Sequence, residues 1–153
     1  MWAYESVFYQ IYPIGFCGAP RVNDGVTVPR IRKVSDWAEH IASLGCNAVY
    51  FSPIFESDSN HRYDTADYRR IDPMLGTEED FRTLCREAGC RGIRVMLDGV
   101  FNHTGSNSRY FNAQGFYPEL GAAQSRESQY YNWYSFHPWP EDYDAWWGIK
   151  NLP

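Results

Sequence analysis

Two short segments of the chain gather side chains that could bind or orient a polar substrate. In the first, Asp98, Asn102 and His103 lie within six residues and follow an apolar run that is typical of a strand. An Asp, an Asn and a His offer a charge partner, a carbonyl ligand for a hard cation and a hydrogen-bond donor. Alternatively, Asp98 caps a turn, Asn102 bonds to the backbone and His103 is a surface side chain.

The second segment, residues 63–68, lies in a polar stretch without a sustained hydrophobic period. Tyr63 could stack on the C–H-rich face of a sugar ring while Asp64 accepts hydrogen bonds from ring hydroxyls. In the alternative interpretation, Asp64 and Asp67 form Asx-turns and Tyr68 belongs to the core. Residue types alone leave both interpretations open.

Aromatic residues are unusually dense near the C-terminal end. They make up 18% of the chain, and nine of them lie between Tyr130 and Trp147. Such a cluster can be plain core, because each ring buries a large apolar area. Flat rings bordered by polar groups also suit sugar rings. The cluster is therefore a second candidate for carbohydrate binding.

The elements that must position these side chains alternate along the chain. Residues 7–12, 48–51 and 93–97 are short apolar runs, rich in β-branched or aromatic residues, and each predicts a strand; the first is expected to be buried. Residues 99–153 show no clean helical or alternating pattern, which indicates an irregular insertion or the start of a small subdomain.

Helices are predicted between these strands. The first is capped by Ser35 or Asp36 and ends at Gly45, and the second opens with a capping box at residues 77–80 and ends at Gly89. Their apolar faces are expected to comprise Trp37, Ile41 and Leu44 in the first, and Phe81, Leu84, Cys85 and Ala88 in the second.

This order of strands and helices predicts an α/β fold in which parallel strands are joined by right-handed crossovers. An open doubly wound sheet and a (β/α)8 barrel both begin in this way. The first strand is not followed by a Gly-x-Gly-x-x-Gly motif, which disfavours a nucleotide-binding sheet. Long polar segments after the strands favour the barrel, of which residues 1–98 supply about three βα units.

Composition excludes several classes of partner. A net charge of −5 offers no global positive field for nucleic acid or anionic lipid. The sequence has neither an apolar stretch of membrane-spanning length nor a recognisable secretory signal. We expect a cytoplasmic protein whose scattered cysteines are reduced: Cys17, Cys46, Cys85 and Cys90.

Three segments together resemble the α-amylase family of glycoside hydrolases. They are Tyr9-Gln10-Ile11-Tyr12-Pro13, residues 61–68 and residues 98–103, in matching order and spacing over residues 7–153. The resemblance implies the first units of a (β/α)8 TIM barrel in residues 1–98 and the start of the inserted B subdomain in residues 99–153. Arg62 stands where many relatives carry Gly, and this pattern is similar to the neopullulanase and cyclomaltodextrinase-like branch.

The resemblance also implies roles for individual residues. Tyr63 looks like the aromatic that stacks under the glucose unit at the cleavage point, and Asp64 would help to hold that part of the site together. His103 is similar to the histidine that hydrogen-bonds a hydroxyl of the same sugar. Asp98 matches the aspartate that braces an arginine on a later strand, and Asn102 matches a residue that ligates a structural Ca²⁺ in many members.

The implied activity is retaining hydrolysis or transglycosylation of an α-glucan or maltooligosaccharide, with α-1,4 bonds as the first expectation and α-1,6 bonds as a further one. Retaining chemistry uses two carboxyl groups about 5–5.5 Å apart. In this family the catalytic acids follow strands four, five and seven, so we expect none of them here and predict that residues 1–153 alone are inactive. Glu119, Glu141, Asp142 and Asp144 are expected to be solvated surface residues.

Two other functions remain open. The chain could be a non-catalytic carbohydrate-binding or scaffold protein that uses the aromatic cluster. It could also be a relative that kept the barrel as a transporter-associated subunit. The oligomeric state is left undetermined by the sequence.

Overall fold

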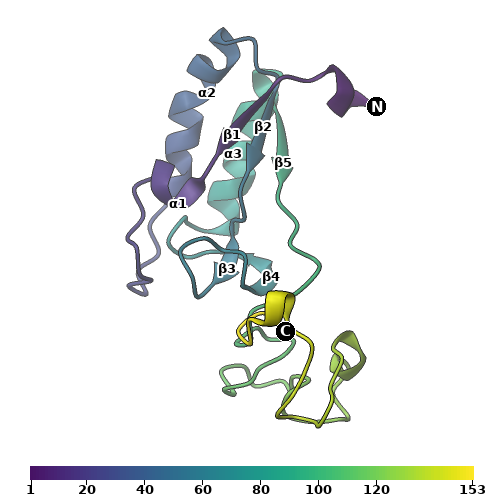
Figure 1. Ribbon diagram of the computed structural model, residues 1–153. Coiled ribbons are helices and arrows are strands. Elements are labelled where there is room, and N and C mark those ends of the chain that lie inside the picture. Colours follow the sequence, from purple (N-terminus) through teal and green to yellow (C-terminus); the bar gives the residue numbers. More distant parts are fainter. The chain divides into compact units, whose positions relative to one another are not determined.

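The computed structural model describes all residues from 1 to 153 and divides them into two compact units (Figure 1). Unit 1 comprises residues 1–54 and 70–99, and unit 2 comprises residues 55–69 and 100–153. The sequence analysis placed residues 55–69 with the first region. In the structure they belong to unit 2, because main-chain oxygens of Thr65 and Ala66 accept hydrogen bonds from later residues of that unit.

Unit 1 contains a parallel three-stranded sheet in the order β1-β2-β5 (Figure 1). The strands are β1 (Phe8–Ile11), β2 (Ala48–Phe51) and β5 (Arg94–Leu97). Tyr9 pairs with Val49, which pairs in turn with Val95. The predicted α/β class with parallel strands is therefore confirmed. The expectation that the first strand is buried is wrong, since only Ile11 of β1 is buried.

The helices of unit 1 are the short α1 (Pro13–Phe16), α2 (Lys33–Ser43) and α3 (Glu78–Cys90). Helix α2 leads from β1 to β2, and α3 leads into β5, so both crossovers advance in the same direction across the sheet. Right-handed crossovers then place both helices on one face. The core of this unit includes Val34, Ala38 and Ile41 from α2, Leu84 and Ala88 from α3, and Val49, Phe51 and Ile93 from the sheet side.

The predicted apolar face of α2 is partly wrong. The buried residues of this helix are Val34, Ala38 and Ile41, whereas Trp37 is 39% exposed and Leu44 is 55% exposed. The helix also begins at Lys33, and its N-cap, Arg32, makes no side-chain cap and lies three or four residues before the predicted caps. The helix has two overlapping apolar stripes, Val34-Ala38-Ile41 and Trp37-Ile41-Leu44. The first, which has the smaller side chains, is the one that packs into the core.

Helix α3 begins as predicted, with a capping box. The Asp80 main-chain N–H donates to Thr77 Oγ1 at 3.2 Å, and the Asp80 carboxylate accepts from the Thr77 N–H at 2.9 Å. The helix extends one residue beyond the predicted end, Gly89. Leu84 and Ala88 are buried, while Phe81 and Cys85 are half-buried.

Unit 2 has little regular structure, as the sequence indicates for residues 100–153. Its two-stranded sheet pairs β3 (Phe55–Ser57) with β4 (Thr65–Ile71), whose last two residues belong to unit 1. Neither strand was predicted. The remaining regular elements of the chain are 3₁₀ turns at Trp2–Glu5, Arg30–Arg32, Tyr131–Trp133 and Trp146–Gly148.

Part of the aromatic cluster forms the core of unit 2. Phe111 is 1% exposed and contacts Tyr134, Phe136 and Tyr143, with ring centroids between 4.7 and 5.9 Å away. Beside it, the buried Asn112 donates from Nδ2 to the main-chain oxygens of residues 117 and 119, each at 3.0 Å. Aromatic stacking and a buried amide thus replace regular backbone pairing in this unit. Helices with the length and apolarity of a membrane span are absent from the structure.

Candidate functional site

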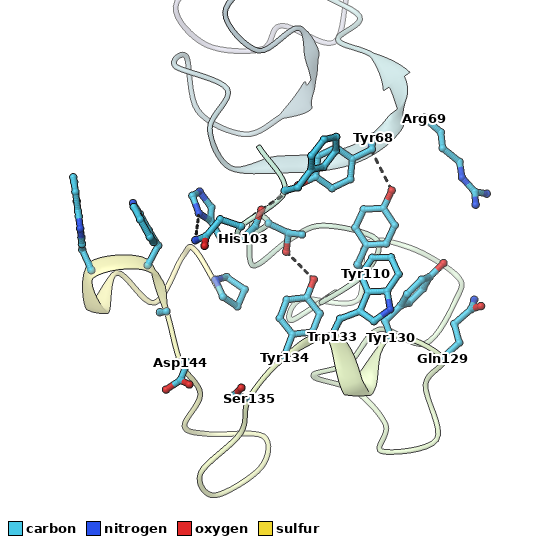
Figure 2. Close-up of a pocket in the computed structure, with 17 residues that line it drawn as sticks. Tyr68, Arg69, His103, Tyr110, Gln129, Tyr130, Trp133, Tyr134, Ser135 and Asp144 are labelled. Carbon is cyan, nitrogen blue, oxygen red and sulfur yellow. Dashed lines mark hydrogen bonds between the residues drawn. The ribbon is translucent and has the colours of Figure 1, made fainter. Parts of the chain in front are cut away.

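Unit 2 contains a cavity of about 960 Å³. Its walls come from the end of β4, residues 101–104, Tyr110 and residues 129–147, and Pro153 completes the lining. In Figure 2, Tyr110, Trp133 and Tyr130 lie together, while Ser135 and Asp144 lie apart from them. A cavity lined mainly by rings with a few polar groups is the usual form of a small-molecule site.

One wall of the cavity is a packed set of aromatic rings. Tyr110 stacks between Tyr68 at 5.6 Å and Trp133 at 5.3 Å, with interplanar angles of 29° and 24°. Tyr130 meets both Tyr110 and Trp133 edge-on, with centroids at 5.2 and 5.0 Å. These are the offset and edge-to-face arrangements that aromatic rings prefer. The wall is therefore preorganised rather than assembled by a ligand.

Tyr68 ties this wall to the segment that follows β5. Its hydroxyl contacts the main-chain oxygens of Val100 and His103, and its N–H donates to the Tyr110 hydroxyl at 3.2 Å (Figure 2). Burial is the main cause that raises the pKa of the Tyr68 phenol. The hydroxyl thus remains a donor at neutral pH. This contact supports the interpretation of Tyr68 as a packed residue.

A second half-buried phenol, that of Tyr134, contacts the segment that follows β5. The Tyr134 hydroxyl lies 2.8 Å from Thr104 Oγ1, which accepts a hydrogen bond from the Ser108 hydroxyl at 3.1 Å. Burial raises the pKa of Tyr134 to about 12. The sequence analysis did not identify Thr104 or Tyr134 as site residues, although Tyr134 belongs to the aromatic cluster that it named.

His103 is held on three sides. Its Nε2 lies 2.9 Å from the main-chain oxygen of Tyr63, and its Nδ1 lies 3.3 Å from Nδ2 of Asn102. Because a carbonyl oxygen can only accept, the proton is on Nε2, and Nδ1 accepts from the Asn102 amide. The ring also stacks on Trp146, at 5.7 Å and 24°. His103 and Asn102 both line the cavity.

Tyr63 and Asp64 lie beside His103 but outside the lining of the cavity. The Tyr63 side chain is 42% exposed, and its ring is tilted against His61 at 6.1 Å. The Asp64 carboxylate accepts hydrogen bonds from the Ser57 and Ser59 hydroxyls and, at 3.0 Å, from the Ser59 N–H. In this structure Asp64 holds its own loop, and the carboxylate faces serines.

The side chain of Arg62 lies inside this loop and hydrogen-bonds to its main chain. Arg62 is completely buried, its φ is +66°, and Nη1 donates to the main-chain oxygens of Ser57 at 2.7 Å and Ser59 at 2.9 Å. A left-handed φ favours glycine. Arg62 adopts this conformation with its guanidinium bonded to the main chain of the same loop.

Asp98 belongs to unit 1, whereas the other predicted site residues belong to unit 2. Its Oδ2 accepts a hydrogen bond from the Tyr50 hydroxyl at 2.6 Å. Both residues lie at the carboxyl ends of neighbouring parallel strands, β2 and β5. The structure thus links Tyr63, Asn102 and His103 to one another and gives Asp98 a separate partner.

The residues present do not fit a calcium site. Asn102 is exposed and directs its amide nitrogen toward His103, and no group of three or more His, Cys, Asp or Glu side chains is close enough to hold a metal. A calcium ion normally takes six to eight oxygen ligands. In the structure Asn102 hydrogen-bonds to His103.

Three acidic residues of the insertion pair with basic side chains. Asp142 pairs with Lys150 at 2.5 Å, Asp144 with His137 at 2.8 Å, and Glu119 with Arg109 at 2.9 Å. Arg109 also binds the buried Asp67 at 2.7 Å, and this hydrogen bond is the main cause that raises the pKa of the guanidinium. Sequence reasoning had no signal for this pairing, because Asp67 and Arg109 are far apart along the chain.

Comparison with known proteins gives consistent matches. The family model for the α-amylase catalytic domain matches residues 10–147. Amylopullulanase from Thermoanaerobacterium saccharolyticum is 45% identical over 129 residues, which cover 80% of this chain and 10% of that protein. Neopullulanase 2 from Thermoactinomyces vulgaris is 37% identical over 156 residues, covering 91% and 25% respectively.

A solved structure extends the match to nearly the whole chain. Cyclic α-maltosyl-(1→6)-maltose hydrolase from Arthrobacter globiformis, in complex with its substrate, has a TM-score of 0.74 and 34% identity. The match covers 99% of this chain and 37% of that one. The chain therefore spans roughly a tenth to a third of the proteins to which it is similar.

Proposed function

The chain belongs to the α-amylase family of glycoside hydrolases, and from this premise we propose that its unit 2 cavity binds an α-glucan or maltooligosaccharide. The relatives confirm the predicted resemblance, including the neopullulanase and cyclomaltodextrinase-like branch. By this proposal the activity to which the chain contributes is retaining cleavage or transfer at α-1,4 and α-1,6 glucosidic bonds.

The observation that carries the proposal is the aromatic wall beside His103. Tyr110 and Trp133 present flat faces of the kind that pack against the C–H face of a sugar ring. Gln129, Ser135 and Asn102 supply amide and hydroxyl groups in the same lining, where they can bond to sugar hydroxyls. Apolar faces with few convergent polar groups are what a carbohydrate requires.

The sugar-subsite roles of Tyr63, Asp64 and His103 remain part of the proposal. Because His103 already uses Nε2 on the Tyr63 oxygen, a sugar hydroxyl that bonds to this nitrogen must compete with that carbonyl. Tyr63 has an exposed ring available for stacking, whereas Asp64 acts through the loop that it holds. Asp98, in unit 1, is proposed to brace an arginine on a later strand.

Catalysis by the acidic residues of unit 2 is not part of the proposal. Asp142, Asp144 and Glu119 each bond to a basic side chain at the surface. The hydrogen bond from Lys150 lowers the pKa of Asp142, which disfavours the protonated form that a general acid needs. We propose that residues 1–153 bind the glucan without cleaving it. We also propose a cytoplasmic location, which the four unbridged cysteines favour.

Calorimetric titration of residues 1–153 with maltoheptaose tests the binding, and a reducing-sugar assay on the same sample tests the absence of cleavage. Saturable binding without released sugar is expected. Titration that shows no heat and no fluorescence change at millimolar maltoheptaose would contradict the proposal.

A non-catalytic carbohydrate-binding protein is the second candidate, because residues 130–147 supply much of the cavity lining. The two candidates differ in their dependence on His103 and Tyr63. Binding that survives Tyr63→Ala and His103→Ala but is lost in Trp146→Ala favours the second candidate. Loss in all three variants favours the first.

A further inference from the structure

Trp147 combines two features that folding of the chain alone does not explain. Its backbone lies in the left-handed region, with φ of +52° and ψ of +26°. Its side chain is 83% exposed although it is a large apolar group. A bulky residue in this conformation is strained, and such strain is often found at ligand-binding sites. The exposed indole gains little from burial that could offset the strain.

The segment around Trp147 is nevertheless firmly held. The Trp146 N–H donates to the Leu152 oxygen at 2.9 Å, and the Leu152 N–H donates to the Ile149 oxygen at 2.8 Å. The end of the segment bonds to a neighbouring loop, where the Thr104 N–H donates to the Pro153 oxygen at 3.1 Å. Trp147 therefore lies in a turn that main-chain hydrogen bonds close between Trp146 and Leu152.

Trp147 is also the outer member of a ring stack. It stacks on Trp146 at 5.4 Å and 21°, and Trp146 stacks on His103 at 5.7 Å and 24°. All three residues line the cavity. One face of the Trp147 indole is thus fixed against its neighbour, and the high exposure of the side chain leaves the other open to a ligand.

We propose that Trp147 is a carbohydrate-binding platform that takes the C–H face of a glucose unit of the bound glucan. This inference rests on the proposed function. Trp146 acts as a positioning residue between the platform and His103, so that a sugar on Trp147 is placed in register with the histidine. The side chain of Asp144, which also lines the cavity, supplies an acceptor for sugar hydroxyls.

The substitution Trp147→Gly separates binding from folding. Glycine adopts a φ of +52° without strain, so the melting temperature is expected to stay the same or rise. Loss of one stacking face is expected to weaken maltoheptaose binding about five- to tenfold. Trp147→Phe keeps a ring and should stay within about twofold of the parent chain.

Phe116→Ala is the matched control, because Phe116 is an aromatic of unit 2 that is 65% exposed and does not line the cavity. It should leave the affinity for maltoheptaose unchanged. If Trp147→Gly binds as tightly as the parent chain, or if it melts several degrees lower, the platform is refuted while the proposed function stands. If the parent chain itself binds no maltoheptaose, the proposed function fails and the platform fails with it.

Discussion

The Nε2 nitrogen of His103 lies 2.9 Å from the main-chain oxygen of Tyr63. This bond joins the segment after β5 to the loop before β4, and both belong to unit 2. The two segments that the sequence analysis singled out for chemistry are thus in direct contact. Their contact runs through a ring nitrogen and a main-chain oxygen, and the Tyr63 side chain takes no part in it.

Replacing His103 by Phe should remove this bond and keep the ring that stacks on Trp146. A net loss of about 1 kcal/mol in the free energy of unfolding is expected for one hydrogen bond. Urea denaturation monitored by fluorescence measures it. His137→Phe removes an exposed histidine and should leave the free energy of unfolding nearly unchanged. Equal effects of the two substitutions would contradict the prediction.

Gly105→Ala should destabilise unit 2. A Cβ at this position would lie 2.6 Å from the main-chain oxygen of Asp64, and backbone atoms cannot move aside cheaply. A loss of about 1–3 kcal/mol is expected for such overpacking. Gly89→Ala is the control, since the added methyl meets nothing within 4 Å in helix α3. That variant should be about 0.5–1 kcal/mol more stable in the same denaturation experiment.

Arg109→Met should strongly destabilise the chain because Asp67, which is 1% exposed, loses its cationic partner. An uncompensated buried carboxylate costs about 3–5 kcal/mol. Arg82→Met is the matched control, since the ion pair between Arg82 and Glu78 is exposed and should contribute less than about 0.5 kcal/mol. Thermal melting of both variants checks this, and a difference below about 1 kcal/mol would refute it.

Thr77→Ala should lose the cap of α3, at a cost of about 1 kcal/mol at neutral pH. Hydrogen bonds from Thr77 are the main cause that lowers the pKa of Asp80 below its ordinary value of 3.8. A lowered pKa stabilises the folded state above the unfolded value, and this contribution is lost as the pH falls through the folded value.

The difference in stability between parent and Thr77→Ala should therefore be full at pH 6 and shrink below about pH 4. Chemical denaturation at pH 6, 4 and 3 measures it. A difference that grows on acidification would show that Asp80 is not the partner that matters. Ser43→Ala, at the C-terminal end of α2, is the control. Its effect on stability should not change with pH, because the Ser43 hydroxyl bonds to the main-chain oxygen of His40.

The parts of the structure that could be predicted from sequence are those decided by neighbouring residues. The strands β2 and β5 are short apolar runs whose strand conformation follows from composition, although only β2 is largely buried. The cap of α3 joins Thr77 to Asp80, three residues away, so its geometry is contained in one turn. The family segments were recognisable because each is itself a short stretch of the chain.

Only the tertiary structure decided the remainder, because long-range packing selects among locally equivalent choices. The sheet determined that Ala38 of α2 is buried and Trp37 is not, although both lie on apolar stripes. Strand β4 pairs with β3, and main-chain N–H groups of residues 105 and 109, some forty residues later in the chain, also bond to its first two residues. The position of His103 depends likewise on an oxygen forty residues earlier, and no local pattern of residue types encodes that distance.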